Sequence, residues 1–280
     1  MAAHSGYSPN ATMPVHPTPP HSFCVKVSII TVVYNGAEHI RDCIDSVISQ
    51  TYSNIEYIVV DGNSTDGTVT IIQSYGTKVA CFVSEPDKGL YDAMNKGIRL
   101  ATGEVIGLLN ADDFYRHNGV IANMVKLIEQ TGSEAAYGDM VYVERDNVEK
   151  PRRYWRSGWY KDNAFMWGWM PGHLSFFARR SLYERYGLFR LDMKSAADYE
   201  LMLRFIHKNK VRLAYMNEVT IVMRVGGISN SSVKNRIRAN SEDRLAWQLN
   251  GMRPYFFTLW LKPLRKLRQY VSKPPKINHP

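Results

Sequence analysis

The chain has 280 residues, of which 45% are hydrophobic, so it can bury one large α/β domain and is not disordered throughout. Its three cysteines, an odd number without paired spacing, argue against a disulfide framework and favour a reducing, cytoplasmic location. We expect neither a secretory signal nor a membrane-spanning helix, because no suitable apolar run is present.

The formal net charge of +9 is confined to the C-terminal segment. Residues 231–280 hold eleven lysines and arginines but two acids, whereas the first 230 residues hold 24 of each kind. A neutral body with acidic clusters argues against a protein that binds nucleic acid. The sequence therefore predicts a neutral body followed by a basic extension.

Regular structure is expected from residue 25 onward, after a leader, 1–24, that is rich in Pro, His, Ser and Thr and is predicted to be flexible. Apolar runs of strand length then alternate with segments of helical periodicity, one of them marked by Leu90, Met94, Ile98 and Ala101. The predicted strands are 27–34, 55–60, 79–83 and 104–109. This β-α-β-α-β-α-β order predicts an α/β fold with a largely parallel central sheet flanked by helices.

The pattern becomes weaker after residue 150. A helix at 119–129 and a strand at 135–143 still extend the alternation, but residues 151–180 are rich in Trp, Tyr and Gly and predict loops and short strands over a groove. A further helix is expected at 197–207 and a strand at 219–225.

Acidic clusters follow two of the predicted strands. Asp61 comes directly after the strand 55–60, and Asp112 and Asp113 follow the strand 104–109. Because parallel strands deliver their carboxyl ends to one edge of the sheet, the two clusters should meet there. Adjacent carboxylates repel each other unless a cation lies between them, and oxygen ligands suit Mg²⁺ or Mn²⁺. A metal-bound nucleotide diphosphate site is the prediction, although Asp66 is better interpreted as a residue that caps the next helix.

Other functions remain open at this point. A metal-dependent nucleotidyl- or phosphotransferase also needs acids at strand ends, but no GxxxxGK[ST] phosphate loop is present. A dinucleotide oxidoreductase is disfavoured because no GxGxxG follows the first strand. A non-enzymatic nucleic-acid binder would use the basic extension.

The ordered series SIITVVYNG, DGNSTDGT, SEPDKGLYDAMNKGI and LLNADDFY resembles the family-2 glycosyltransferases over residues 25–230. The resemblance implies a GT-A domain with a donor half, 25–115, and an acceptor half, 116–230. It also implies inverting transfer from a nucleotide sugar, with UDP-sugars favoured and Mg²⁺ or Mn²⁺ as cofactor. The DKGLYDAMNKG and NADD motifs resemble those of bacterial enzymes that build O-antigen and other surface polysaccharides, which implies a glycan or lipid-linked acceptor.

The resemblance also implies residue roles. Asp61 would lie beside the nucleobase and ribose, Asp112 would contact the ribose or the metal shell, and Asp113 would bind the metal directly. Asp198, in the segment Ala-Asp-Tyr-Glu, stands where the family places its general base. Two departures are evident: Gly62 stands where many members have a second acid, and Asn110 occupies the first position of the usual DxD motif.

Three further residues are candidates with equally ordinary alternatives. Lys88 follows a strand and would line the donor pocket, or lie in a solvated turn. Arg224, with Ser229, resembles a loop that closes over the donor, or forms a simple turn. His173 would contact the acceptor or the diphosphate, or be a hydrogen-bonded structural residue.

The segment 254–271 interleaves aromatic and aliphatic residues with lysines and arginines. One hypothesis places it on the anionic inner leaflet of the plasma membrane as a basic amphipathic element, which makes the protein peripheral. The alternative is a helix packed on the catalytic body with a solvated basic face. Pro263 argues against a single continuous helix.

Overall fold

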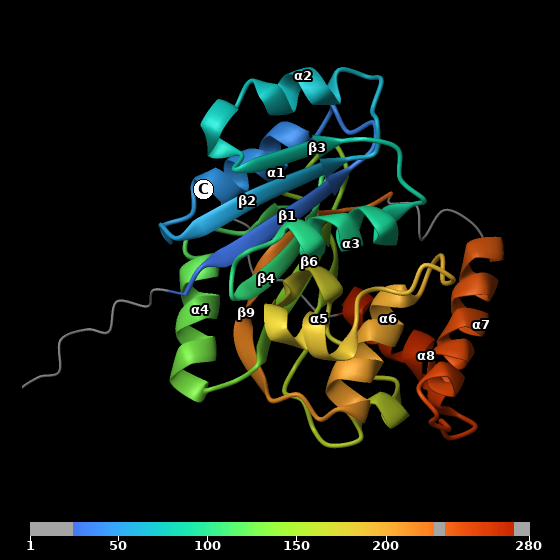
Figure 1. Ribbon diagram of the computed structural model, residues 1–280. Helices are drawn as coiled ribbons and strands as arrows, with labels where there is room; N and C mark the ends of the chain where they lie inside the picture. Colours follow the sequence, from blue (N-terminus) through green and yellow to red (C-terminus); the bar gives the residue numbers. More distant parts are fainter. Residues whose placement is uncertain (1–24, 227–232, 272–280) are drawn as a thin grey trace, which may run out of the picture.

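The computed structural model describes residues 25–226 and 233–271, so the predicted leader 1–24 lies outside it (Figure 1). Its strands are β1 (Val27–Val33), β2 (Ile55–Asp61), β3 (Cys81–Ser84), β4 (Val105–Asn110), β5 (Phe114–Tyr115), β6 (Ala135–Val143), β7 (Pro151–Trp155), β8 (Phe176–Arg179) and β9 (Leu213–Arg224). Its α-helices are α1 (Ile40–Ile48), α2 (Thr68–Gln73), α3 (Leu90–Leu100), α4 (Val120–Thr131), α5 (Arg180–Tyr186), α6 (Ala197–Met202), α7 (Val233–Leu249) and α8 (Thr258–Val271). Shorter turns are the 3-10 helices η1 (Gly76–Lys78), η2 (Ala164–Trp167) and η3 (His173–Ser175) and the π-helical turn η4 (Leu203–Lys208).

One nine-stranded sheet has the order β3-β2-β1-β4-β8-β6-β9-β5, with β7 paired to β6. The first four strands of this order are parallel, as the alternation of strands and helices predicts. β8 then pairs antiparallel with both β4 and β6, so the remainder of the sheet is mixed. The predicted parallel pairing thus holds throughout the donor half, and β6 and β9 form a further parallel pair in the acceptor half. The segment between β7 and β8 lacks the long crossover helix that parallel neighbours need.

The donor half packs its helices closely on buried strands. Every residue of β1 is buried, which explains its continuous apolar sequence. A Cβ atom at Gly97 of α3 would lie 2.3 Å from Cγ2 of Ile30, so only glycine permits this helix–sheet approach. Leu90, expected in the apolar stripe of α3, is exposed because it is the first residue of the helix, and Tyr91 is buried instead.

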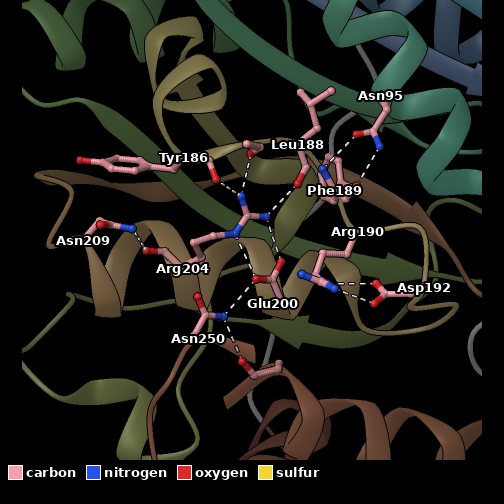
Figure 2. A network of polar contacts seen from close by, with 12 residues as sticks. Asn95, Tyr186, Leu188, Phe189, Arg190, Asp192, Glu200, Arg204, Asn209 and Asn250 are labelled. Carbon is pink, nitrogen blue, oxygen red and sulfur yellow. Dashed lines mark hydrogen bonds and ion pairs between the residues drawn. The ribbon is translucent and has the colours of Figure 1, made fainter. Parts of the chain in front are cut away.

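A buried ion pair fixes the helix that carries Asp198. The predicted helix 197–207 forms as α6 followed by η4, and Arg204 of η4 donates to both carboxylate oxygens of Glu200, at 3.0 and 2.9 Å. Figure 2 shows the same guanidinium reaching back to the backbone carbonyls that follow α5, including that of Leu188 at 2.8 Å. Asn250, at the end of α7, donates to Glu200 at 3.0 Å. The network therefore joins three segments around one charge pair.

The C-terminal helices are part of the folded body. In Figure 1 the orange and red helices α7 and α8 lie beside α6, away from the donor strands. Trp247 of α7 is fully buried and its indole N–H donates to the Tyr199 hydroxyl at 3.0 Å. α8 runs without interruption through Pro263, so the expected break is wrong. As the sixth residue of the helix, the proline removes one backbone hydrogen bond, to the Leu259 carbonyl, and the helix continues without it.

Among the described helices, none has the length and apolar character that crossing a membrane requires. Cys43 and Cys81 are free thiols, while Cys24 lies outside the described residues.

Candidate active site

Asp61 is the last residue of β2 and is fully buried. One carboxylate oxygen accepts a hydrogen bond from the Ser64 hydroxyl at 2.5 Å, and the other accepts from the Ser64 N–H at 2.9 Å and the Ser84 hydroxyl at 2.7 Å. The carboxylate is therefore fixed by its own loop and by the end of β3.

The loop after β1 is joined to the loop after β2. Asn35 accepts a hydrogen bond from the Thr65 N–H at 2.9 Å. Asp66 accepts from the N–H of Thr68, the first residue of α2, at 3.1 Å and from the N–H of Ala37 at 3.0 Å. Asp66 thus holds the two loops together.

The loop after β3 reaches the same edge. A Cβ atom at Gly62 would lie 2.6 Å from a carboxylate oxygen of Asp87, so this acid occupies the space beside Asp61 that a side chain at 62 would fill. Lys88 is exposed next to it, and its N–H donates to Asp92 at 3.0 Å. The ends of β1, β2 and β3 therefore gather Asp61, Asp87 and Lys88 along one rim.

Asp112 and Asp113 follow β4 but have different surroundings. Asp113 is buried and accepts hydrogen bonds from the Arg224 N–H at 3.0 Å and the Asn110 amide at 3.3 Å. Asp112 is half-buried, and its carboxylate receives no hydrogen bond from the described residues. Asp112 therefore has the less engaged carboxylate of the two, whereas the family resemblance implies direct metal binding by Asp113.

Arg224, at the end of β9, is almost completely buried. Its guanidinium donates to the backbone carbonyl of Asp112 at 2.8 Å, pairs with Asp42 and lies 5.0 Å above the Phe114 ring. The structure thus places this cation behind the acid pair, where it anchors the loop. The segment that follows, with Ser229, lies outside the described residues.

The acid pair fits a divalent cation that is shared with a substrate diphosphate. Burial and the neighbouring charge of Asp112 raise the pKa of Asp113, and a cation would relieve this repulsion. Residues 25–226 and 233–271 contain no group of three or more His, Cys, Asp or Glu side chains placed to enclose a metal. One or two carboxylates completed by substrate phosphates is a common arrangement for Mg²⁺.

Asp198 lies at the start of α6, and its side chain is 19% exposed. The Tyr91 hydroxyl donates to one carboxylate oxygen at 3.2 Å, and Nδ1 of His173 lies 3.4 Å from the other. Tyr91 is in the first turn of α3, the helix that follows the Asp87–Lys88 loop. Asp198 is therefore tied to the same edge of the sheet as the donor-half acids.

Of the two side chains next to Asp198, the sequence indicated one, His173, but not the other, Tyr91. His173 was a candidate, and burial lowers its pKa although the charge of Asp198 opposes this. Tyr91 was missed, because the helical stripe was assigned through Leu90 and not through its neighbour.

An acid from α7 positions the segment before Asp198. Glu242 accepts hydrogen bonds from the N–H groups of Ser195 at 2.7 Å and Ala196 at 2.9 Å. These are the last residues before α6, where helical N–H groups lack internal partners. The C-terminal region thus takes part in placing Asp198.

The tryptophans of the 151–180 segment divide into buried and exposed groups. Trp169 is buried and donates to the Ser157 carbonyl at 2.8 Å, so it is a core residue. Trp159 and Trp167 are exposed, and Trp167 packs against Phe257 just before α8.

Comparison with known proteins identifies the family. Residues 28–187 match the model described as glycosyl transferase family 2. An uncharacterized glycosyltransferase of Rickettsia typhi is 31% identical over 209 residues, 71% of this chain and 64% of that protein. The PGL/p-HBAD biosynthesis glycosyltransferase of Mycobacterium tuberculosis is 29% identical over 211 residues, 74% of this chain and 80% of that protein. The chain thus spans less than two thirds of the rickettsial relative's length.

Solved structures support the fold. Staphylococcus aureus TarS superimposes with a TM-score of 0.62 at 18% identity, over 89% of this chain and 44% of that one. The mannosyltransferase PcManGT of Pyrobaculum calidifontis gives a TM-score of 0.60 at 24% identity, over 85% of this chain and 72% of that one. The matched family model covers more than half of the chain and agrees with the acids at the sheet edge. The chain belongs to glycosyltransferase family 2 and has the GT-A fold.

Proposed function

We propose that the protein transfers a sugar, with inversion, from a nucleoside-diphosphate sugar to an acceptor hydroxyl. The observation that supports this proposal is the hydrogen bond from the Tyr91 hydroxyl to Asp198. It places a partly exposed carboxylate at the edge of the sheet where Asp61, Asp112 and Asp113 also lie. A base on one side of the sugar and the diphosphate on the other is the arrangement that in-line displacement needs.

Asp198 removes the proton of the acceptor hydroxyl while that oxygen forms a bond to the anomeric carbon. The bond from the anomeric carbon to the phosphate oxygen breaks, and the nucleoside diphosphate leaves with the electron pair. His173 and Tyr91 hold the carboxylate and leave lone pairs for the proton. A bound Mg²⁺ or Mn²⁺ would neutralise charge on the leaving diphosphate, with the half-buried Asp112 as its more accessible ligand and the buried Asp113 behind it.

A uridine donor is favoured. TarS has been solved with UDP and with UDP-GlcNAc, whereas PcManGT has been solved with GDP-Man and Mn²⁺. Asp61 would face the ribose and base, and Asp87 supplies the second acid that Gly62 lacks. Lys88, exposed on the same rim, would contact the donor phosphates.

The acceptor we propose is a glycan or lipid-linked glycan of a bacterial surface polysaccharide such as O-antigen. The mycobacterial relative, whose name places it in PGL/p-HBAD biosynthesis, supports a role in glycolipid assembly. The second support is the outer face of α8, which gives the protein a means to remain at the cytoplasmic surface of the plasma membrane.

The outer face of α8 is apolar. Trp260, Leu264 and Leu267 are one helical stripe, and they are 70%, 55% and 61% exposed, while Phe256 just before the helix is 91% exposed. The two acids of the basic C-terminal segment, Glu242 and Asp243, are both hydrogen-bonded inside the protein. Apolar side chains in a region whose remaining charges are cationic match an anionic lipid surface.

Flotation of the full-length protein with phosphatidylglycerol vesicles tests this membrane surface. The Trp260→Gln/Leu264→Gln double variant should lose vesicle binding, and Leu100→Gln, which removes a comparably exposed leucine in the donor half, should retain it. Equal flotation of the double variant and the wild type would rule out α8 as the membrane surface.

Donor turnover tests the central proposal. The wild-type protein, incubated with a panel of nucleotide sugars and Mn²⁺, should slowly hydrolyse one of them to the nucleoside diphosphate. Asp113→Ala should abolish this hydrolysis. A panel without any hydrolysis, or a variant as active as the wild type, would contradict the proposal.

A further inference from the structure

The inner face of α8 carries two lysines, Lys262 and Lys266, beside the buried Leu259. Lys262 donates to Asp243 of α7 at 2.6 Å, and its ammonium lies 3.7 Å from the centre of the Tyr199 ring. Asp243 is buried, and Tyr199 is the residue next to Asp198. This part of α8 is therefore fixed against the helix that bears the proposed base.

The other end of the same face is fixed to β7. Gln269 accepts a hydrogen bond from Nε of Arg153 at 2.6 Å. The Arg153 guanidinium lies over the rings of Tyr142 and Trp155, at 4.5 and 5.1 Å, and is mostly buried. A second cation is thus held in place beside α8.

Lys266 lies between these two anchors, one helical turn after Lys262 and just before Gln269. It is half-buried, and no residue in the described part of the chain gives its ammonium a hydrogen bond or an ion pair. Residues 1–24, 227–232 and 272–280 contain neither Asp nor Glu, so they cannot supply a side-chain carboxylate. Burial, together with the charges of Lys262 and Arg153, lowers the pKa of Lys266 to about 8, although Asp243 and Asp198 oppose this.

A half-buried ammonium next to two other cations is unfavourable unless an anion joins it. Lys262, one turn earlier on the same face of α8, lies against Tyr199, the residue next to Asp198, so this face of α8 points toward the proposed base. The exposed apolar stripe is on the opposite side of the same helix, about one helix diameter of 10 Å away. A diphosphate at the head of a membrane lipid would have to cross this distance to bring its sugar to the base.

We propose that Lys266, supported by Lys262 and Arg153, binds a phosphate or diphosphate group of the acceptor beside Asp198. The inference deepens the proposed function, since it depends on Asp198 marking the acceptor site. The acceptor would then be an anionic phosphate ester. Its hydroxyl that receives the sugar would lie beside Asp198, and its apolar part would lie toward the outer face of α8.

Inorganic pyrophosphate is the probe, titrated calorimetrically into the full-length protein in EDTA so that metal-dependent binding at Asp112 and Asp113 does not contribute. Lys266→Met, which keeps the length of the side chain without its charge, should weaken binding about tenfold or more. Lys266→Arg should retain binding, and Arg265→Met, which removes the exposed neighbouring cation, should leave the dissociation constant within about twofold. Equal losses in Lys266→Met and Arg265→Met, or none in either, would overturn the proposal.

Two further readouts distinguish an anion site at Lys266 from a structural or a lipid-binding role. The melting temperature of Lys266→Met should equal or exceed that of the wild type, because an uncompensated cation is removed; a lower value with unchanged pyrophosphate binding would give Lys266 a structural role and overturn the proposal. Lys266→Met should also float with phosphatidylglycerol vesicles as the wild type does. Loss of flotation with intact pyrophosphate binding would assign the lysine to lipid headgroups instead. Because pyrophosphate binding requires no turnover, a wild type that binds it through Lys266 but hydrolyses no donor would refute the transferase mechanism and support the anion site.

Discussion

The carboxylates of the donor half and of the acceptor half are held in opposite ways. Asp61 and Asp113 are buried and accept hydrogen bonds from their own loops and from neighbouring strands. Asp198 is partly exposed, and its neighbours are side chains from two other elements, Tyr91 and His173. Hydrogen bonds to both oxygens hold Asp61 and Asp113 in fixed positions. Asp198 has lone pairs left to accept a proton, which is what the proposed general base needs.

Asp198→Asn should have the largest effect on rate. Without the base, hydrolysis of the donor by water should fall about 10³-fold, within the usual range for general-base catalysis. The measurement is the initial rate of nucleoside diphosphate release in Mn²⁺. A variant that retains even a tenth of the wild-type rate would place the base elsewhere.

Arg204→Ala should have the largest effect on stability. It leaves Glu200, which is 2% exposed, as an unpaired buried charge, and the free energy of unfolding should fall by about 3–5 kcal/mol. Arg190→Ala is the matched control, because its pair with Asp192 is exposed and should contribute at most about 1 kcal/mol. Equal losses in urea unfolding would mean that the platform under Asp198 does not depend on this pair.

Tyr91→Phe should have a smaller effect on rate. The hydroxyl orients Asp198 without touching the reacting atoms, so donor hydrolysis should fall about tenfold, the value of one hydrogen bond to a charged group. The melting temperature should change little. A loss as large as that of Asp198→Asn would show that the tyrosine itself takes part in the proton transfer.

Replacing Glu56, at the opposite end of β2 from Asp61, should have the smallest effect on stability, and that effect should depend on pH. Burial would raise its pKa, but hydrogen bonds from Lys26, Ser28 and Thr102 lower it to about 2 from an ordinary 4.5. A depressed carboxylate pKa stabilises the fold above the unfolded value, and this stabilisation is lost as the pH falls from 4.5 toward 2.

Glu56→Gln should therefore lower the unfolding free energy by about 1–3 kcal/mol at pH 7 and by less at acidic pH. Glu149→Gln, an exposed control in the β6–β7 connection, should leave the curve unchanged. Parallel pH curves for the wild type and Glu56→Gln would contradict the assignment.

The sequence predicts the donor half well because its strands β1, β2 and β4 are buried along nearly their whole length and lead into polar residues. Buried parallel strands have continuous apolar sequences, and strand ends have polar ones, so β1, β2 and β4 and the acids after β2 and β4 follow from local pattern alone. The beginning of β9 was missed, because residues 213–218 mix exposed and buried positions. The separate surroundings of Asp112 and Asp113 depend on β9, which lies more than 100 residues away.

The C-terminal region shows where local pattern fails. Lysines at helical spacing usually predict a solvated face, but Lys262 and Lys266 face the body while Trp260 and Leu264 face outward. This inversion depends on Asp243, an acid of another helix, and no spacing rule within α8 indicates it. The residues that make the region unusual are thus those that only the folded chain brings together.

A titration of UDP in the presence of Mn²⁺ tests the division between the two halves most directly. Asp112→Asn should bind UDP at least about tenfold more weakly than the wild type, because it removes a charged ligand, while Asp198→Asn should bind it with an unchanged dissociation constant. If Asp198→Asn loses UDP affinity or Asp112→Asn keeps it, the diphosphate does not lie where the strand-end acids meet.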